Sequence, residues 1–255
     1  PEIPEKHYSI ILDQSELDSW VKRLNDADLF AFDTETTSLN YMDAEVVGVS
    51  FAIQPGEAAY VPFSHDYMGA PEQLDRNSVL AQLKPLLENR EKKKVGQNLK
   101  YDKNVLANHD ISLDGIAEDT MLESYVLNST VTRHDMDSLA LKYLGEATVS
   151  FESIAGKGAK QLTFNQIDLE QAGPYAAEDA DITLRLHQAL RPRLAAEGKL
   201  ASVYETIDLP LVPVLSRMEQ RGVMINASTL RNHSQELAER MTELEKAAHD
   251  EAGET

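Results

Sequence analysis

The segment 29–63 constrains the fold most strongly, because it holds three short runs of strand-forming residues in close succession. The runs lie at 29–34, 46–53 and 58–63, and Pro55-Gly56-Glu57 between the last two is typical of a hairpin turn. Helical spacing follows at 78–87, a strand at 94–97, and helices at 99–108 and 119–127. This order predicts an α/β domain with a mixed sheet flanked by helices.

The flanking segments extend this plan. Before residue 29 we predict a strand at 8–12 and a helix at 15–25, with Ser15 and Asp18 resembling a capping box. After residue 136 the chain is mostly helical, with a loop at 154–160. We expect a helix at 175–194 that Gly173-Pro174 starts or kinks, and further helices at 209–220 and 227–252.

Composition excludes several classes of protein. The 43 acidic and 24 basic residues give a net charge of −19, so the chain cannot bind duplex DNA through overall positive charge alone. This balance suits a small-molecule enzyme, a metal-dependent enzyme, or a fragment whose basic partner is missing. The absence of cysteine excludes disulfides, thiolate metal sites and a cysteine nucleophile. No apolar run approaches the ~18 residues of a membrane span, so we expect a soluble, cytoplasmic protein.

Common catalytic motifs are also missing from the sequence. It has no phosphate-binding P-loop, no Gly-x-Ser-x-Gly elbow and no His-Glu-x-x-His. The seven histidines are scattered, so their spacing predicts no histidine-based metal site. The remaining candidates for chemistry are carboxylates.

The triplet Asp33-Thr34-Glu35 closes the predicted buried strand 29–34. Residues i and i+2 of a strand share a face, and two neighbouring carboxylates repel unless a divalent cation bridges them. Asp-x-Glu also begins at Asp43 and Asp168, but only Asp33 follows an apolar run. The triplet therefore predicts either a metal site or a pair of acids that cap the sheet edge.

Two further positions carry weak signals. Asp102 follows a predicted strand and begins a helix, where the helix dipole alone would favour an acid. Tyr175 and Asp179 are four residues apart on a predicted helix and share a face, as residues of a solvated acidic face also would.

Taken in order, Asp33-x-Glu35, Asp102 and Tyr175-x-x-x-Asp179 resemble the signature of the exonuclease superfamily with four acidic residues and a tyrosine. Flanking motifs narrow the resemblance to the 3′–5′ proofreading domain of bacterial family A DNA polymerases, over nearly the whole chain. These motifs are Phe-Asp-Thr-Glu-Thr at 32–36, Val-Gly-Gln-Asn-Leu-Lys-Tyr-Asp at 95–102, Asp-Thr-Met-Leu at 119–122, His-Asp-Met-Asp-Ser-Leu at 134–139, and Tyr-Ala-Ala-Glu-Asp-Ala at 175–180. The stretch 209–223 resembles the start of the polymerase domain.

The resemblance implies a ribonuclease-H-like mixed sheet flanked by helices, followed by a helical extension. It implies an exonuclease domain at 1–197 and, at 198–255, the truncated helical start of the polymerase thumb, without polymerase activity. The implied reaction is 3′–5′ hydrolysis of single-stranded or frayed DNA with two divalent cations, Mg²⁺ or Mn²⁺, with Zn²⁺ also compatible.

Site roles follow by the same resemblance. Asp33, Glu35 and Asp179 would hold the first metal, and Asp33 would bridge to a second that Asp102 supports. Tyr175 and Glu35 would orient the attacking hydroxide. DNA would be contacted by Leu39 and Phe151, which pack against terminal bases, and by Gln97, Asn98, Tyr101 and Arg133.

The implied partners are the 3′ end of single-stranded DNA and the remainder of a polymerase chain, with no membrane. We expect a monomer in the cytoplasm, associated with the bacterial nucleoid. Two alternatives stay open: an RNA-trimming exonuclease resembling ribonuclease D, and an inactive structural domain. The stretch 209–223 argues against the first, and the presence of all four acids argues against the second.

Overall fold

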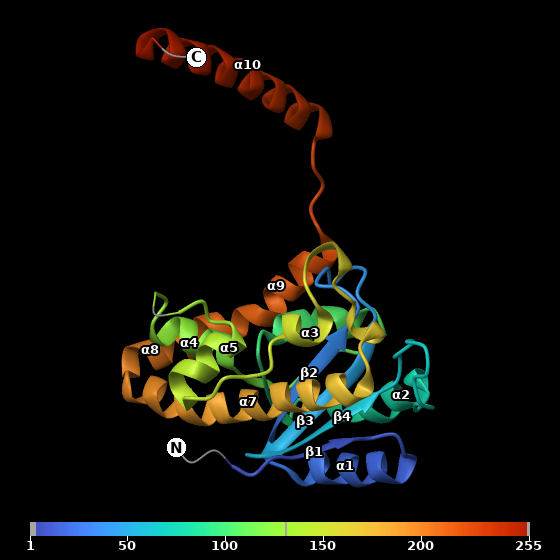
Figure 1. Cartoon of the computed structure of the whole chain (residues 1–255). Coiled ribbons are helices and arrows are strands. Elements are labelled where there is room, and N and C mark those ends of the chain that lie inside the picture. The colour runs from blue at the N-terminus through green and yellow to red at the C-terminus, as the bar shows by residue number, and fades with distance from the viewer. Residues whose placement is uncertain (1–3, 131, 254–255) are drawn as a thin grey trace. The chain divides into compact units, whose positions relative to one another are not determined.

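The computed structural model describes residues 4–130 and 132–253. Within them, six strands form one sheet in the order β1-β4-β3-β2-β5-β6 (Figure 1). The strands β2, β3 and β4 pair antiparallel, whereas β1 joins β4, β5 joins β2 and β6 joins β5 in parallel. The predicted mixed sheet is confirmed. The strands are β1 (His7–Ile10), β2 (Leu29–Thr36), β3 (Val46–Gln54), β4 (Glu57–Pro62), β5 (Lys93–Gly96) and β6 (Ile116–Asp119).

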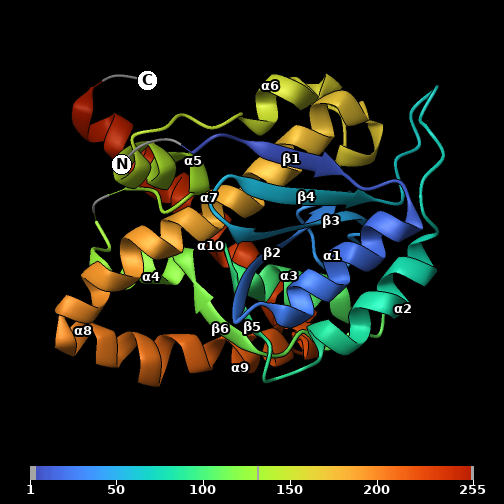
Figure 2. The ribbon, with the colours of Figure 1, turned by 90° about the horizontal axis from the view of Figure 1, so that it is seen from below.

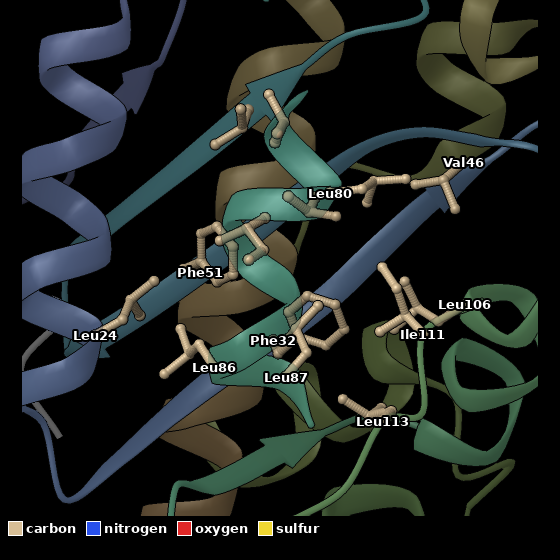
Figure 3. Packing of buried hydrophobic residues seen from close by; sticks show 14 of the residues in the cluster. Leu24, Phe32, Val46, Phe51, Leu80, Leu86, Leu87, Leu106, Ile111 and Leu113 are labelled. Atoms are coloured by element: carbon tan, nitrogen blue, oxygen red, sulfur yellow. The ribbon is translucent and has the colours of Figure 1, made fainter. Parts of the chain in front are cut away.

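One face of the sheet is covered by α1 (Gln14–Asp26), α2 (Arg76–Leu87) and α3 (Leu99–Ala107), as Figure 2 shows. Apolar residues of these helices meet the alternate side chains of β2 and β3 that point to this face. The rings of Phe32 and Phe51 lie 5.8 Å apart at the centre of this core (Figure 3). Because these rings occupy one face of the sheet, the alternate side chains of β2 point to the opposite face.

The opposite face is crossed by the long helix α7 (Leu169–Ala196), which contacts β1 to β5 (Figure 2). Its contact with the sheet is made by small residues, including Ala31 and Ala52 of the sheet and Ala177 and Ala180 of the helix. Small side chains on both surfaces let the helix axis approach the strands closely. Side chains of α7 are therefore held near the end of β2.

The start of α7 differs from the prediction. Asp168 caps the helix by accepting from the backbone of Glu170, so α7 begins six residues before Tyr175. Gly173-Pro174 therefore lies inside the helix. A Cβ atom at Gly173 would overlap the present side chain of Ile10 in β1, so glycine allows α7 to pack closely on the sheet there. That packing sustains the helix despite the proline.

Three other local predictions need correction. The cap of α1 is Asp13, which accepts from the backbone of Ser15 at 2.7 Å, so Ser15 and Asp18 do not form the cap. The segment predicted as one helix at 119–127 contains the end of strand β6 and then α4 (Thr120–Leu127). The predicted loop 154–160 overlaps the end of α6 (Phe151–Ala155) and contains a 3₁₀ turn at Gly158–Lys160.

The remaining elements are mostly helical, as predicted. Gly56, with φ of 81°, completes the β3–β4 hairpin. The other helices are α5 (Met136–Leu139), a π-helix at Ala140–Leu144, a 3₁₀ turn at Phe164–Gln166, α8 (Gly198–Val203), a π-helix at Tyr204–Asp208, α9 (Leu209–Arg221) and α10 (Ala227–Ala252).

The chain divides into two compact units, Pro1–Gln220 and Arg221–Thr255. The first contains the sheet and its covering helices, and α9 is joined to α3 by a hydrogen bond from Ser216 Oγ to Asn104 Oδ1 at 2.6 Å. The second consists mainly of α10, which has no buried residue. Over the described residues, we find no helix with the length and apolar character needed to cross a membrane.

Candidate active site

The end of β2 delivers two carboxylates to the α7 face of the sheet. Phe32 and Thr34 point to the opposite face, so Asp33 and Glu35, which alternate with them, point toward α7. There they meet Asp179 of α7, and one carboxylate oxygen from each of the three residues lies within 4.8 Å of the others. The geometry thus brings together three acids that are up to 146 positions apart in the sequence.

Asp102 reaches the same strand from the other side. Its Oδ1 atom accepts hydrogen bonds from the Thr34 backbone at 3.0 Å and from Thr34 Oγ1 at 2.6 Å. Thr34 lies between Asp33 and Glu35, so this pair of hydrogen bonds fixes the fourth acid beside the other three. Asp102 is only 2 % exposed.

The position of Asp102 depends on Asp119, which the sequence suggested only as part of a motif. The carboxylate of Asp119 accepts from the backbone of Asn98 at 3.2 Å and of Leu99 at 2.8 Å, and it also caps α4. Asn98 adopts a left-handed conformation with φ of 67°. Asp119 therefore fixes the turn that starts α3. Its place at the start of the helix predicted for 119–127 was the available signal.

A second residue that the sequence did not single out is Tyr60 of β4. Glu35 pairs across the sheet with Gly48, and the ring of Tyr60 fills the space that a Cβ at Gly48 would need. Burial raises the pKa of Tyr60, and the charges of Glu35 and Asp33 raise it further. Tyr60 also makes a 2.8 Å hydrogen bond with Nε2 of His65. Tyr60 thus forms part of the wall beside Glu35.

The surroundings of the four carboxylates raise their pKa values and so oppose their ionisation. Burial raises the pKa of Asp33, and the charges of Asp102 and Asp179 raise it further. The pKa values of Glu35 and Asp179 are likewise raised, mainly by burial. Burial raises the pKa of Asp102 to about 7 although the bonds from Thr34 act in the opposite direction.

This setting fits a divalent cation. Across the described residues, no lysine, arginine or histidine forms an ion pair with any of the four acids. The Oε1 atom of Glu35 is buried and has no hydrogen-bond partner in this part of the chain. Oxygen ligands of this kind suit Mg²⁺ and Mn²⁺, whose charge would offset the repulsion between the acids.

Tyr175 lies one turn before Asp179 on α7, against two aromatic rings. Its ring centroid is 6.2 Å from that of Phe151 and 5.9 Å from that of Phe164, and Phe151 stacks on Phe164. Burial raises the pKa of the Tyr175 phenol, as do the charges of Asp179, Glu35 and Asp33. The phenol therefore keeps its proton at neutral pH and can donate a hydrogen bond. The internal position of Pro174 leaves Tyr175 on the same face as Asp179.

The predicted DNA contacts lie in different surroundings. Leu39 is 93 % exposed in the loop after β2, and Tyr101 supports this loop through 2.5 Å contacts from its hydroxyl to Ser38 O and Thr36 Oγ1. Phe151 packs on Tyr175, as described above. Asn98 begins α3.

Two of the predicted DNA contacts, Gln97 and Arg133, lack a direct connection to the carboxylate cluster in the part of the chain that the structure describes. Gln97 is engaged in other hydrogen bonds, and Arg133 pairs with an acid outside the cluster. The Gln97 amide donates to the backbone of His134 at 2.8 Å and accepts from Thr120. Arg133 is exposed and lies 3.5 Å from Asp135. Among the described residues, Arg133 forms no ion pair or hydrogen bond with the four carboxylates, so a role for Arg133 requires a substrate that extends from the site.

The other two Asp-x-Glu triplets serve local structure. Asp43 is exposed and accepts from the Asn40 side chain at 2.5 Å. Asp168 caps α7. Only the triplet that follows an apolar strand joins the carboxylate cluster.

Comparisons with known proteins agree with this geometry. Residues 8–195 match a family model described as 3′–5′ exonuclease. The chain is 63 % identical over 251 residues to DNA polymerase I of Pseudomonas aeruginosa, covering 98 % of this chain and 28 % of that protein. It is 44 % identical to DNA polymerase I of Rhizobium leguminosarum, over 97 % of this chain and 26 % of that one. The chain thus spans about a quarter of the length of these relatives.

Solved structures share the fold at lower identity. The polymerase domain of Pol1 from M. smegmatis, in complex with DNA primer-template and dNTP, matches with a TM-score of 0.72 and 21 % identity, over 96 % of this chain and 38 % of that one. Brucella melitensis NrnC matches with a TM-score of 0.61 and 19 % identity, over 86 % and 94 %. NrnC with bound Mg²⁺ matches with a TM-score of 0.58 and 21 % identity, over 86 % and 95 %. These likenesses concern the fold alone, a ribonuclease-H-like mixed sheet flanked by helices.

Proposed function

Because the chain belongs to the 3′–5′ exonuclease family of bacterial DNA polymerase I, we propose that it removes nucleotides from the 3′ end of single-stranded or frayed DNA. The observation that carries the proposal is the carboxylate cluster: Asp33, Glu35 and Asp179 within 4.8 Å of one another, with Asp102 bound to Thr34 between them. In the longer relatives this activity would act as proofreading.

The geometry of the acids supports the ligand roles that the resemblance implies. Asp33, Glu35 and Asp179 would share one divalent cation, and Asp33 and Asp102 would hold a second. Two cations, Mg²⁺ or Mn²⁺, would stabilise the attacking and leaving oxygens of an in-line displacement at phosphorus. The partnerless Oε1 of Glu35 supports this assignment, because a buried carboxylate oxygen without a donor is costly unless it is a ligand.

The protein's own groups would position the water and the phosphate. The Tyr175 phenol, which keeps its proton, would donate a hydrogen bond to the attacking oxygen, and Glu35 would accept one from it. The attack would release a nucleoside monophosphate and leave a shortened strand with a free 3′ hydroxyl. Asp119 would act at a distance, by fixing the turn that places Asp102.

The strand would be held by stacking and not by charge, since the chain carries a net charge of −19. Phe151 stands against Tyr175, and Leu39 projects from the loop that Tyr101 supports. Apolar contacts of this kind accept any base, which suits an enzyme that removes whatever nucleotide ends the strand. Asn98, Gln97 and Arg133 are proposed to contact the backbone further along.

The direct test is digestion of a 3′-labelled single-stranded DNA oligonucleotide with Mg²⁺ and, separately, with EDTA. We expect the label to be released as a mononucleotide only with Mg²⁺. A matched RNA oligonucleotide tests the rival activity, and preferential digestion of RNA would favour it. An absence of cleavage together with no metal binding by calorimetry would support an inactive structural domain.

The remaining proposals concern the longer protein. The relatives are named DNA polymerase I, and this chain corresponds to about a quarter of each. We propose that the first partner of this chain is the rest of such a polymerase, that it acts as a monomer, and that it works in the cytoplasm at the nucleoid.

A further inference from the structure

A second cluster of metal-ligating side chains lies away from the active site. It consists of Glu118 at the end of β6, Glu123 on α4 and His187 on α7, and one potential ligand atom from each lies within 4.8 Å of the others. The three elements adjoin one another in the first compact unit (Figure 2). The scattered spacing of the histidines gave no sign of this cluster, because residues 123 and 187 meet only in the folded chain.

The carboxylate of Glu123 is the observation that points to a ligand. Glu123 is fully buried, and its Oε1 atom lies 2.7 Å from Nδ1 of His187. Its Oε2 atom is also buried and has no hydrogen-bond partner over the described part of the chain. A buried carboxylate oxygen without a donor loses its hydration without replacement, so a cation at this position would remove the penalty.

The charges around the cluster favour a cation. The charges of Glu118 and Asp119 act on Glu123, and the guanidinium paired with this group, that of Arg191, contacts Glu118 and Glu205. Arg191 donates to Glu118 at 3.1 Å and also pairs with Glu205, so its charge is shared between two acids. The local excess is therefore negative even with Arg191 in place.

Two further observations concern the shape of the site and the space beside it. Tyr204 donates to Glu118 Oε2 at 2.9 Å and accepts from the Asp119 backbone at 2.9 Å. A cavity of about 480 Å³ is lined by Glu118 and His187, together with Lys93, Arg191 and Glu205. Two of the three proposed ligands therefore line a cavity, whereas Glu123 does not.

We propose that Glu118, Glu123 and His187 form a binding site for a borderline divalent transition ion such as Zn²⁺, separate from the catalytic cations. One imidazole with two carboxylates is a ligand set that Zn²⁺ accepts and that Mg²⁺ does not prefer. Ligand atoms at about 2.1 Å from a tetrahedral ion lie roughly 3.4 Å apart, so side-chain shifts on the order of 1 Å would close the site. The ion would fasten β6, α4 and α7 behind Asp119.

The experiment separates this site from the catalytic one. In an Asp33→Ala background, which removes the shared ligand of the catalytic pair, calorimetry should detect one Zn²⁺ per chain in the presence of excess Mg²⁺. Adding His187→Gln should weaken this binding at least tenfold, as should Glu118→Gln. In the same background Co²⁺ should give a visible absorption band that depends on His187, because the catalytic site offers oxygen ligands only.

Retention of Mg²⁺-dependent cleavage by His187→Gln in the wild-type background is the control that this variant folds, since His187 takes no part in the proposed reaction. Glu118→Gln, at a partly exposed position, is the second variant if His187→Gln fails that control. The proposal is overturned if the Asp33→Ala protein binds no Zn²⁺, or if Zn²⁺ binding is unchanged by the folded variants. Either result would leave the proposed exonuclease function intact.

Discussion

Replacing Asp102 by asparagine removes one charge from the carboxylate cluster while keeping the size of the side chain. The amide oxygen of asparagine can still accept the two hydrogen bonds from Thr34 that fix the present side chain. Asp102 is 2 % exposed, and burial raises its pKa to about 7 from the ordinary value of 3.8. The variant therefore tests mainly the cost of the buried charge.

The sign of the effect follows from proton linkage. Below about pH 4 the carboxyl group is protonated in both the folded and the unfolded chain, so ionisation contributes nothing. Between about pH 4 and pH 7 the unfolded chain releases the proton while the folded chain keeps it, so the free energy of unfolding of the metal-free protein falls as the pH rises. Above pH 7 both states are ionised, and the loss stays constant.

The magnitude follows from the shift of about three pKa units. At 1.36 kcal/mol per unit, the charge of Asp102 costs roughly 4 kcal/mol above pH 7 in the absence of metal. The asparagine variant recovers this cost, reduced by the need of its new N–H₂ group for a partner. We expect the metal-free variant to be about 2–4 kcal/mol more stable than the wild type at pH 8, and to differ little at pH 4.

The assay is urea unfolding in EDTA at several pH values between 4 and 8. Asp43→Asn is the matched control, because Asp43 also begins an Asp-x-Glu triplet but is exposed, and it should follow the wild-type profile. Asp102→Asn should also lose Mg²⁺-dependent cleavage while it gains stability. If the difference in unfolding free energy between Asp102→Asn and the wild type is the same at every pH, the pKa of Asp102 is not raised in the folded protein. The predicted pH dependence would then be refuted.

Four further predictions address the reaction. Asp33→Ala should lower cleavage by orders of magnitude without lowering metal-free stability, as measured by digestion and urea unfolding, since it removes both a ligand and a repulsive charge; near wild-type cleavage would refute the site. Tyr175→Phe should slow single-turnover cleavage by ~10–1000-fold with little change in calorimetric metal binding, because one positioning hydrogen bond is lost; an unchanged rate would exclude a catalytic role. Phe151→Ala should weaken single-strand binding by the ~1–3 kcal/mol of a base stack, equally for all four terminal bases, in a fluorescence titration; unchanged affinity would leave Phe151 as packing for Tyr175 and Phe164. The purified protein should incorporate no labelled nucleotide into a primer, and any incorporation would contradict the expectation that residues 198–255 are a truncated polymerase start without polymerase activity.

Much of the fold could be predicted because its signals are local. The hairpin at Pro55-Gly56 and the helices at 209–220 and 227–252 follow from turn chemistry and periodicity, and the structure confirms them. The start of α7 could not be predicted, because Gly173 and Pro174 are unfavourable within a helix. Their tolerance there depends on contact between Gly173 and Ile10, which lie 163 positions apart.

The short strand β6 illustrates the same limit. Residues 116–119 carry no alternating pattern, and they form a strand because β5 offers a parallel edge at Lys94–Gly96. Lys94 stands in a run of three lysines, a residue type that is mostly exposed in folded proteins. It is instead fully buried, with its ammonium group donating to the carbonyl oxygens of Asn89 and Asp114.

The sequence by itself determined which carboxylates are candidates for the site, because Asp33-x-Glu35 follows an apolar strand and the later acids stand in recognisable motifs. Only the tertiary structure decided what surrounds them: the bonds from Thr34 to Asp102, the turn that Asp119 fixes, and the aromatic stack behind Tyr175. It also decided that Glu123 and His187 meet. Motifs record residue types at short spacing, whereas burial, pKa and ligand geometry depend on groups that adjoin only after the sheet and α7 have packed together.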